Sequence, residues 1–127
     1  MQDSNLILLN QAVTATVTGS WFDLGKGGVA FGLDVEIVIP QATGTSPVLG
    51  IAFDFGDDGS TAADTYTVVE SGTAGAGLVG TLFKRLRTRH RYVRPVLTVG
   101  GTTPNFGTVT IQGSSGLSYR DANIPNS

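Results

Sequence analysis

The sequence predicts an all-β domain, folded as an antiparallel sandwich or barrel. Glycine, threonine and valine are abundant where strong helix formers are scarce, and 18 glycines interrupt the chain at short intervals. Short segments alternate apolar and polar residues with the period of a half-buried strand, and no window sustains a helical period. A chain of 127 residues suits one domain, which at this size buries about two thirds of its unfolded surface.

The predicted strands follow one another closely along the chain. Residues 33–39 (LDVEIVI) alternate apolar and mostly acidic side chains until Pro40 ends the run. Residues 48–55 (VLGIAFDF) place Phe53 and Phe55 on one side, and the turn between the two segments predicts that they pair as a hairpin. The same alternation predicts further strands at residues 12–18, 20–24, 64–71, 78–86, 91–99 and 107–112. Short strands joined by turn-rich links are typical of sandwiches and barrels.

Both ends of the chain differ from its middle. Residues 1–10 (MQDSNLILLN) carry an apolar run and are expected to form an N-terminal arm or edge strand. Residues 11–112 are expected to form the β-sandwich domain, and the polar residues 113–127 to form a C-terminal tail. An apolar arm is either an edge strand of its own domain or an addition to a neighbour's sheet.

Composition excludes several classes of site. The chain has no cysteine and a single histidine, His90, so disulfides, thiolate metal sites and histidine clusters are not available to it. No apolar run approaches the roughly 20 residues of a membrane span, and the run at residues 6–9 lacks the basic lead-in of a signal peptide. We therefore expect a soluble protein made in the cytoplasm, with no membrane partner.

The segment RLRTRHRYVRP, residues 85–95, holds five arginines and the only histidine. If residues 78–86 and 91–99 pair as a hairpin, the link RTRH is an exposed, charged tip. On alternation, Tyr92 and Arg94 then face outward beside one another. The same alternation turns three apolar side chains toward the core, namely Val93, Leu97 and Val99.

Three interpretations of this basic segment are open. Arginines can neutralise phosphates, but the whole chain has a net charge of −2 and a pI near 5.1, which disfavours direct nucleic-acid binding. The charges can also simply protect a solvated tip from edge-to-edge pairing. We favour docking against an acidic protein surface, because the planar guanidinium makes two parallel contacts with a carboxylate.

No catalytic, cofactor or metal site is expected. The loop DFGDDGS, residues 54–60, has three carboxylates but not the spacing, closing glutamate or flanking helices of a helix-loop-helix calcium site. Aspartate and glycine also serve there as turn residues. His90 lies between Arg89 and Arg91, which disfavour its protonated form and leave it a poor partner for a distant carboxylate. Residues 71–80 (SGTAGAGLVG) lack the features of a phosphate-binding loop and are interpreted as a flexible link.

Three stretches resemble the capsid cement, or decoration, proteins of tailed bacteriophages, in particular the jelly-roll type of a Bordetella phage. They are NLILLNQAVTATVTGSWFDLG, VLGIAFDFGDDGSTAADTYTVVES and RYVRPVLTVGGTTPNFGTVTIQ, which together extend over roughly residues 5 to 112. The resemblance implies a jelly-roll β-sandwich with extended N- and C-terminal arms. It also implies binding to the outer capsid surface of the virion, where the protein bridges neighbouring major capsid proteins. It further implies a homo-oligomer, most commonly a dimer, although trimers also occur among decoration proteins.

The chain departs from this family pattern in its arginine-rich segment and in its tail beyond Gln112. We expect contacts with the capsid or a sister subunit to be made by Leu6, Ile7, Leu8, Leu9, Arg85, Arg87, Arg89, Arg91, Arg94, Tyr119 and Arg120. The main alternative is a carbohydrate-binding or adhesive sandwich of a phage surface or tail. Its platform would come from Trp21, Tyr66 and Tyr92, and one of the adjacent Trp21 and Phe22 must face outward.

Overall fold

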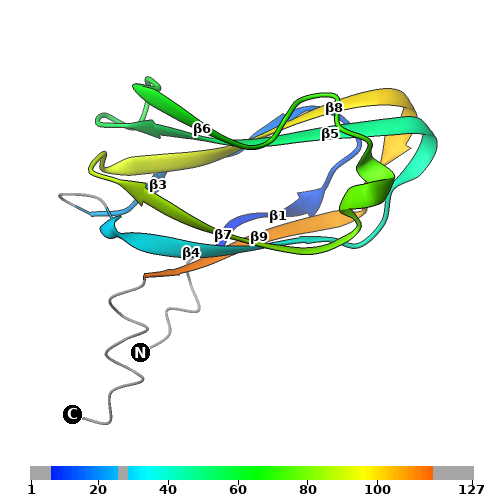
Figure 1. Ribbon diagram of the computed structural model, residues 1–127. Coiled ribbons are helices and arrows are strands. Elements are labelled where there is room, and N and C mark those ends of the chain that lie inside the picture. Colours follow the sequence, from blue (N-terminus) through cyan, green and yellow to red (C-terminus); the bar gives the residue numbers. More distant parts are fainter. Residues whose placement is uncertain (1–6, 26–28, 116–127) are drawn as a thin grey trace, which may run out of the picture.

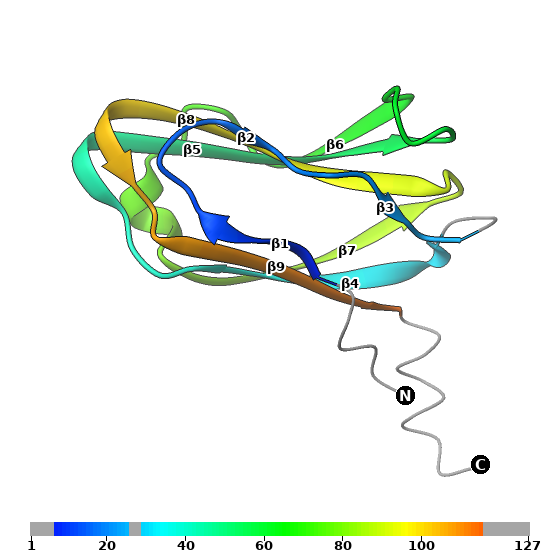
Figure 2. The same ribbon diagram turned by 180° about the vertical axis from the view of Figure 1, so that it is seen from behind.

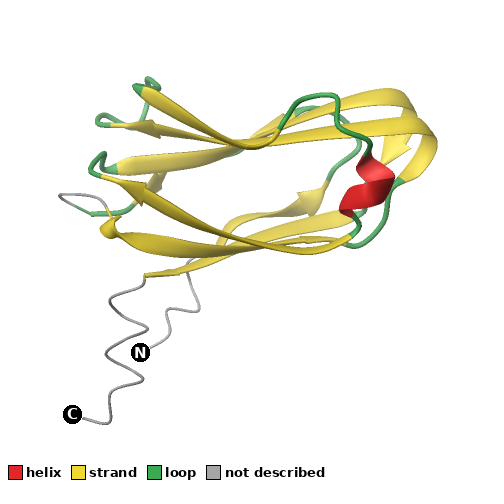
Figure 3. Ribbon diagram, in the orientation of Figure 1, coloured by secondary structure: helices red, strands yellow, loops and turns green. Residues whose placement is uncertain are grey.

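The computed structural model describes residues 7–25 and 29–115, which fold into two antiparallel sheets packed face to face (Figure 1). Apart from one short 3-10 turn, η1 (Gly75–Leu78), the described chain consists of strands and loops (Figure 3). The strands are β1 (Ile7–Ala12), β2 (Val17–Thr18), β3 (Phe22–Asp23), β4 (Val29–Ile39), β5 (Thr43–Gly56), β6 (Asp64–Val69), β7 (Gly80–Thr88), β8 (Tyr92–Asn105) and β9 (Thr108–Ser115). No helix in these ranges is long and apolar enough to cross a membrane.

The strand order is that of a jelly roll. One sheet has the order β1-β9-β4-β7 and the other the order β2-β8-β5-β6, with β3 also pairing with β8. If β2 and β3 are taken as one interrupted strand, the first strand pairs with the last and the second with the last but one. Continuing inward, β4 pairs with β7 and β5 with β6. This is a long hairpin rolled into two sheets, so the predicted all-β sandwich of jelly-roll type is confirmed.

Both predicted hairpins are wrong. β4 and β5 lie in different sheets, as do β7 and β8, so each connection crosses from one sheet to the other. The segment RTRH is therefore the end of β7 and the start of a crossover at one end of the sandwich, not the tip of a hairpin (Figure 1). The physical reason is that alternation identifies the buried face of a strand but not its neighbour. Two strands that bury their faces against each other have the same period as two that hydrogen-bond.

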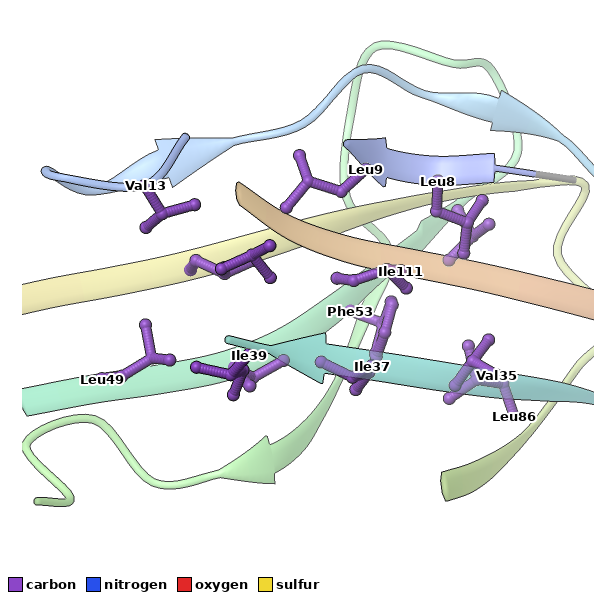
Figure 4. Packing of buried hydrophobic residues seen from close by; sticks show 14 of the residues in the cluster. Leu8, Leu9, Val13, Val35, Ile37, Ile39, Leu49, Phe53, Leu86 and Ile111 are labelled. Carbon is purple, nitrogen blue, oxygen red and sulfur yellow. The ribbon is translucent and has the colours of Figure 1, made fainter. Parts of the chain in front are cut away.

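The core lies between the sheets and contains inward side chains of both. Val35 and Ile37 from β4 meet Phe53 from β5, and all three are almost fully buried. The arm residues Leu8 and Leu9 also point into this core beside Ile111 (Figure 4). Those labelled residues occupy neighbouring positions on four strands, and together they exclude water from the space between the sheets.

The described part of the N-terminal segment, β1, is thus an edge strand of its own sheet. β1 pairs with β9 along the sheet edge (Figure 2), and Leu8 and Leu9 are only 7% and 5% exposed. Burying a leucine side chain stabilises a fold by about 1.5–3 kcal/mol, so neither leucine is free to reach a neighbouring molecule. The expectation that Leu8 and Leu9 contact the capsid is corrected accordingly. At the other end, β9 continues past residue 112, the predicted domain boundary, to Ser115.

The glycine-rich segment interpreted as a flexible link packs against the sandwich. Its centre forms η1 (Gly75–Leu78), where Gly75 is buried. A Cβ atom at Gly75 would lie 2.4 Å from Cε1 of Phe106, a fully buried ring, so only glycine fits. The backbone nitrogen of Leu49 also donates to the carbonyl of Thr73 at 2.9 Å.

Candidate functional site

The basic segment runs along the end of β7, through the crossover and into β8. At the same end of the sandwich lie the β5–β6 loop and β3 (Figure 1). The carboxylates of these neighbouring elements decide which arginines are available to a partner, because an arginine paired within the chain must first give up that pair.

Two of the arginines make bidentate ion pairs with strands that are distant in sequence. Nε of Arg85 donates to Oδ1 of Asp34 at 2.7 Å, and Nη2 donates to Oδ2 at 3.2 Å. Arg91 contacts both carboxylate oxygens of Asp23 at 2.9 Å. The guanidinium of Arg91, helped by the amide of Gly25, lowers the pKa of Asp23 to about 2, and each carboxylate raises the pKa of its arginine. Both pairs have the bidentate geometry that favours arginine and carboxylate, although their half-exposed side chains leave them screened by solvent.

Arg94 is held on the outer face of the sheet β2-β8-β5-β6. Its Nε donates to Oδ2 of Asp54 at 3.1 Å, and its guanidinium carbon lies 4.5 Å from the centre of the Trp21 ring. The hydroxyl of Thr65 donates to the other oxygen of Asp54 at 2.9 Å. One of the adjacent Trp21 and Phe22 was expected to face outward, and it is Trp21, since Phe22 packs against the core. Arg94 is thus fixed from both sides.

Arg87 and Arg89 differ from the other three. Both side chains are exposed, and neither makes an ion pair with any carboxylate among residues 7–25 and 29–115. They lie two residues apart at the end of β7 and the start of the crossover. Of the five arginines predicted to contact a partner, these two carry charge that is not already matched within the described chain.

His90 has a carboxylate partner that sequence reasoning did not expect. Its Nδ1 lies 2.9 Å from Oδ1 of Asp57 in the β5–β6 loop. The crossover and this loop meet at the same end of the sandwich, so a carboxylate far along the chain becomes a neighbour. The contact ties the two loops together.

The three carboxylates of the β5–β6 segment point to different partners. Asp54 is bound by Arg94, and Asp57 contacts His90, while Asp58 accepts the backbone amides of Ser60 and Thr61. Those amide bonds lower the pKa of Asp58. Within the described ranges, no group of three or more His, Cys, Asp or Glu side chains converges as a metal site would require. The carboxylates serve ion pairing and turn formation instead.

The other predicted contact residues divide into three groups. Leu8 and Leu9 are core residues, whereas Ile7 is 42% exposed on β1. The remaining predicted contacts lie outside the described residues; these are Leu6, Tyr119 and Arg120.

Phe83 is the exposed residue that sequence reasoning missed. It lies on β7 and is 70% exposed, and Val79, just before the strand, is 48% exposed. The sequence did contain a signal. Leu82 and Leu86 share one phase of the strand and face inward, so Phe83 in the opposite phase must face outward.

Two hollows lie beside β7. One, of about 550 Å³, lies on the outer face of the sheet β1-β9-β4-β7 and is lined by Glu36, Phe83, Gln112 and their neighbours. The other, of about 330 Å³, lies between the edge strands β6 and β7. Its lining comprises Phe55, Asp64, Thr65, Tyr66, Arg85 and Arg87.

The three candidate platform aromatics do not form one surface. Trp21 is covered by Arg94, and the ring of Tyr92 lies 5.5 Å from the guanidinium of Arg91. Tyr66 lies on β6 and is 42% exposed. Tyr66 is therefore the most exposed of the three.

Comparisons with known proteins give little. No protein-family model matches the chain, and no curated protein matches it. Among solved structures, a chain from Bacillus endospore appendages, described as disulfide-linked pili, aligns with a TM-score of 0.27 and 15% identity. The alignment covers 84% of this chain and 89% of that chain. We draw nothing from a similarity of this size.

Proposed function

We propose that the chain is a structural virion protein of a tailed phage that binds the outer surface of an assembled capsid. It is made in the host cytoplasm and bridges neighbouring major capsid subunits, which stabilises the shell. It acts through contact alone, with no catalysis and no cofactor. The proposal starts from the sequence resemblance to capsid cement proteins and is supported by the jelly-roll topology and the exposed arginines.

The observation that carries the proposal is the division of the arginines. Arg85, Arg91 and Arg94 are each matched by a carboxylate of the chain itself. Arg87 and Arg89 are exposed beside them without such a match among the described residues. The paired arginines brace the end of the sandwich, and the two others present guanidinium groups to an acidic surface. Two guanidinium groups that have no carboxylate partner within the described chain, held on a rigid sandwich, suit recognition of carboxylates on a shell.

Bridging requires more than one foothold on the shell. Once one contact forms, a second contact to a neighbouring subunit is intramolecular, with an effective concentration of order millimolar. Avidity then exceeds either single affinity by roughly 10² to 10⁴. A ligand that binds only the assembled shell also shifts the equilibrium toward assembly by mass action.

The test compares two double variants. Arg87→Ala with Arg89→Ala removes the two exposed guanidiniums, and Arg91→Ala with Asp23→Ala removes one internal pair at no change in net charge. Each lost charge-assisted contact weakens binding roughly tenfold or more. We expect the first variant to bind empty shells far more weakly and with a smaller salt dependence, and the second to bind nearly as the wild type does.

The measurement is co-sedimentation with empty shells across a series of salt concentrations, with cryo-electron microscopy of the decorated shells. Equal binding by both double variants would show that Arg87 and Arg89 do not contact the shell. If the wild-type protein does not bind the shells, the proposed function is wrong.

A second candidate function, carbohydrate binding, is favoured by the hollow between β6 and β7. There the open ring of Tyr66 stands beside the polar side chains of Asp64, Thr65 and Arg87. An aromatic ring flanked by hydrogen-bonding groups is a chemistry that binds sugars. A glycan screen with the wild type and Tyr66→Ala distinguishes the two functions, since shell binding through Arg89 does not need Tyr66.

A further inference from the structure

A row of four outward side chains crosses the whole sheet β1-β9-β4-β7. Ile7 on β1 pairs with Gln112 on β9, which pairs with Glu36 on β4, which pairs with Phe83 on β7. Directly paired residues of neighbouring strands point to the same face of a sheet. The cross-strand row therefore reads apolar, amide, acid, apolar, and its two ends are 42% and 70% exposed.

We infer that this face binds a second copy of the chain, with the two sheets stacked about a two-fold axis parallel to the strands. Such an axis reverses the order of the row. Ile7 then meets Phe83 of the second copy, and Gln112 meets its Glu36. The same contacts recur on the other side of the axis, as a two-fold interface requires. Apolar side chains cover each other at both ends, and each carboxylate faces an amide donor in the middle.

Charge selects this axis over the alternative. A two-fold axis that runs along this row, perpendicular to the strands, would place Glu36 over Glu36 and Phe83 over Phe83. Like charges brought face to face oppose association. The neighbouring row adds no net charge to either arrangement, because Asp34 and Arg85 already pair with each other. The hollow lined by Glu36, Phe83 and Gln112 gives the side chains of the second copy room to enter.

The size of the face limits the area that the dimer can bury. Four strands about 4.8 Å apart and roughly eight residues long present about 500 Å² per copy, or about 1,000 Å² in total. That area is at the lower end of specific interfaces, so we expect a reversible dimer that dissociates on dilution in roughly the micromolar range.

The parallel axis also determines at which end of the dimer Arg87 and Arg89 of each copy lie. It leaves strand direction unchanged, so Arg87 and Arg89 of both copies project from the same end of the dimer. The perpendicular axis would send them to opposite ends. A dimer with both arginine pairs on one side can place two footholds on one shell. This consequence rests on the proposed function, whereas the dimer itself does not.

Cross-linking tests the arrangement directly, because the natural chain has no cysteine. Ile7→Cys and Phe83→Cys are prepared separately, mixed, and treated with a thiol-specific reagent whose spacer is about 10 Å, the packing distance of stacked sheets. We expect covalent dimers from the mixture and almost none from either variant alone. Dimers from Phe83→Cys alone, with none favoured in the mixture, would overturn the parallel axis.

Sedimentation velocity over a concentration series tests the face without modification. Phe83→Asp is expected to shift the dissociation constant at least tenfold toward monomer. Tyr66→Asp, on the opposite sheet and also exposed, is expected to leave it unchanged. A wild type that stays monomeric at high concentration, or a Phe83→Asp variant that dimerises as well as Tyr66→Asp, would overturn the inference.

The dimer and the proposed function fail separately. If the wild-type protein dimerises through Phe83 but does not bind shells, the proposed interface stands and the proposed capsid role is wrong. If the protein stays monomeric and still binds shells, the proposed capsid role stands and the proposed interface is wrong.

Discussion

On the outer face of the sheet β2-β8-β5-β6, Arg94 is fixed between the ring of Trp21 and the carboxylate of Asp54. On the outer face of the sheet β1-β9-β4-β7, the ring of Phe83 is 70% exposed. Both faces carry aromatic and charged residues. On the first of these faces, Trp21, Arg94 and Asp54 are partners of one another, so few unpaired groups remain there for another molecule to contact.

This contrast indicates which surface of the sandwich is the better candidate for binding another molecule. Aromatic and arginine residues are enriched at interfaces because they provide large area and several donors. Residue type alone does not identify the surface, since Trp21 and Arg94 have the favoured types and already satisfy each other. What distinguishes the face of Phe83 is that its apolar area has no cover within the described chain.

Among the substitutions that test this contrast, the largest loss of stability is expected from replacing Asp54. Its side chain is 13% exposed, and that of Arg94 is 26% exposed. Asp54→Ala leaves a half-buried guanidinium without a counter-charge and the Thr65 hydroxyl without its acceptor. We expect the free energy of unfolding to fall by about 1–3 kcal/mol, measured by urea denaturation.

Asp54→Asn is the matched control for that loss. It keeps an acceptor oxygen of the same shape for Thr65 or Arg94 and is expected to lose less stability than the alanine variant. A loss below about 0.5 kcal/mol for Asp54→Ala would mean that this face contributes no more than an ordinary surface.

A smaller effect is expected from the exposed pair of Arg91 and Asp23, and it depends on pH. The folded pKa of Asp23 is about 2, below the ordinary value of 3.8, so its ionised form stabilises the fold. That contribution is fully present above about pH 4 and is lost as the pH falls through about 2. Arg91→Gln removes the larger cause of the shift, while the amide of Gly25 remains as a donor.

Thermal unfolding of the wild type and Arg91→Gln between pH 2 and pH 6, at low salt, measures the difference. We expect the melting temperatures to differ by a constant amount above about pH 4 and to converge toward pH 2. A difference that grows as the pH falls would contradict the assignment. The carboxyl chemical shift of Asp23 gives its pKa directly in both proteins.

The sequence predicted the buried faces of the sandwich well. Alternation in residues 33–39 and 48–55 identified core residues such as Ile37 and Phe53, which are fully buried. It did not predict which strands lie side by side, since period-two alternation is the same for hydrogen-bonded and stacked neighbours. The two links in question, residues 40–42 and 89–91, are as short as hairpin loops, so link length did not distinguish a crossover from a hairpin either.

The candidate site was predicted only in part, for a related reason. Five arginines within residues 85–94 are visible in the sequence. Which of them are free depends on carboxylates that lie far away: Asp34 is 51 residues from Arg85, and Asp23 is 68 residues from Arg91. A cluster of one charge can be recognised locally, but its neutralisation requires the fold.

A still smaller effect on stability is expected from the aromatic ring on the other face. Phe83→Ala removes a side chain that is 70% exposed, so the free energy of unfolding of the dilute monomer should change by no more than about 0.5 kcal/mol. Trp21→Ala is the matched truncation on the opposite face. It removes the ring over Arg94, an interaction that contributes about 0.5–1 kcal/mol in addition to the area that the ring covers.

Urea denaturation of the two alanine variants at low protein concentration compares them directly. Equal losses of unfolding free energy would mean that the side chains of the two faces have equally many partners within the chain. A large loss from Phe83→Ala alone would mean that its ring supports the fold of the monomer, which would count against its role as an uncovered contact residue.

The smallest effect expected is no change at all, in the emission of Trp21. It is the only tryptophan of the chain, and it lies on the sheet opposite to Phe83 with Arg94 over its ring. Dimer formation through the row of Ile7, Gln112, Glu36 and Phe83 leaves that environment untouched, so the emission maximum should stay constant as dimers form on concentration. Fluorescence spectra across the concentration series of the sedimentation experiment provide the measurement. A shift that follows dimerisation and survives Phe83→Asp would place the contact on the face of Trp21, because only a molecule arriving there changes the water around that ring.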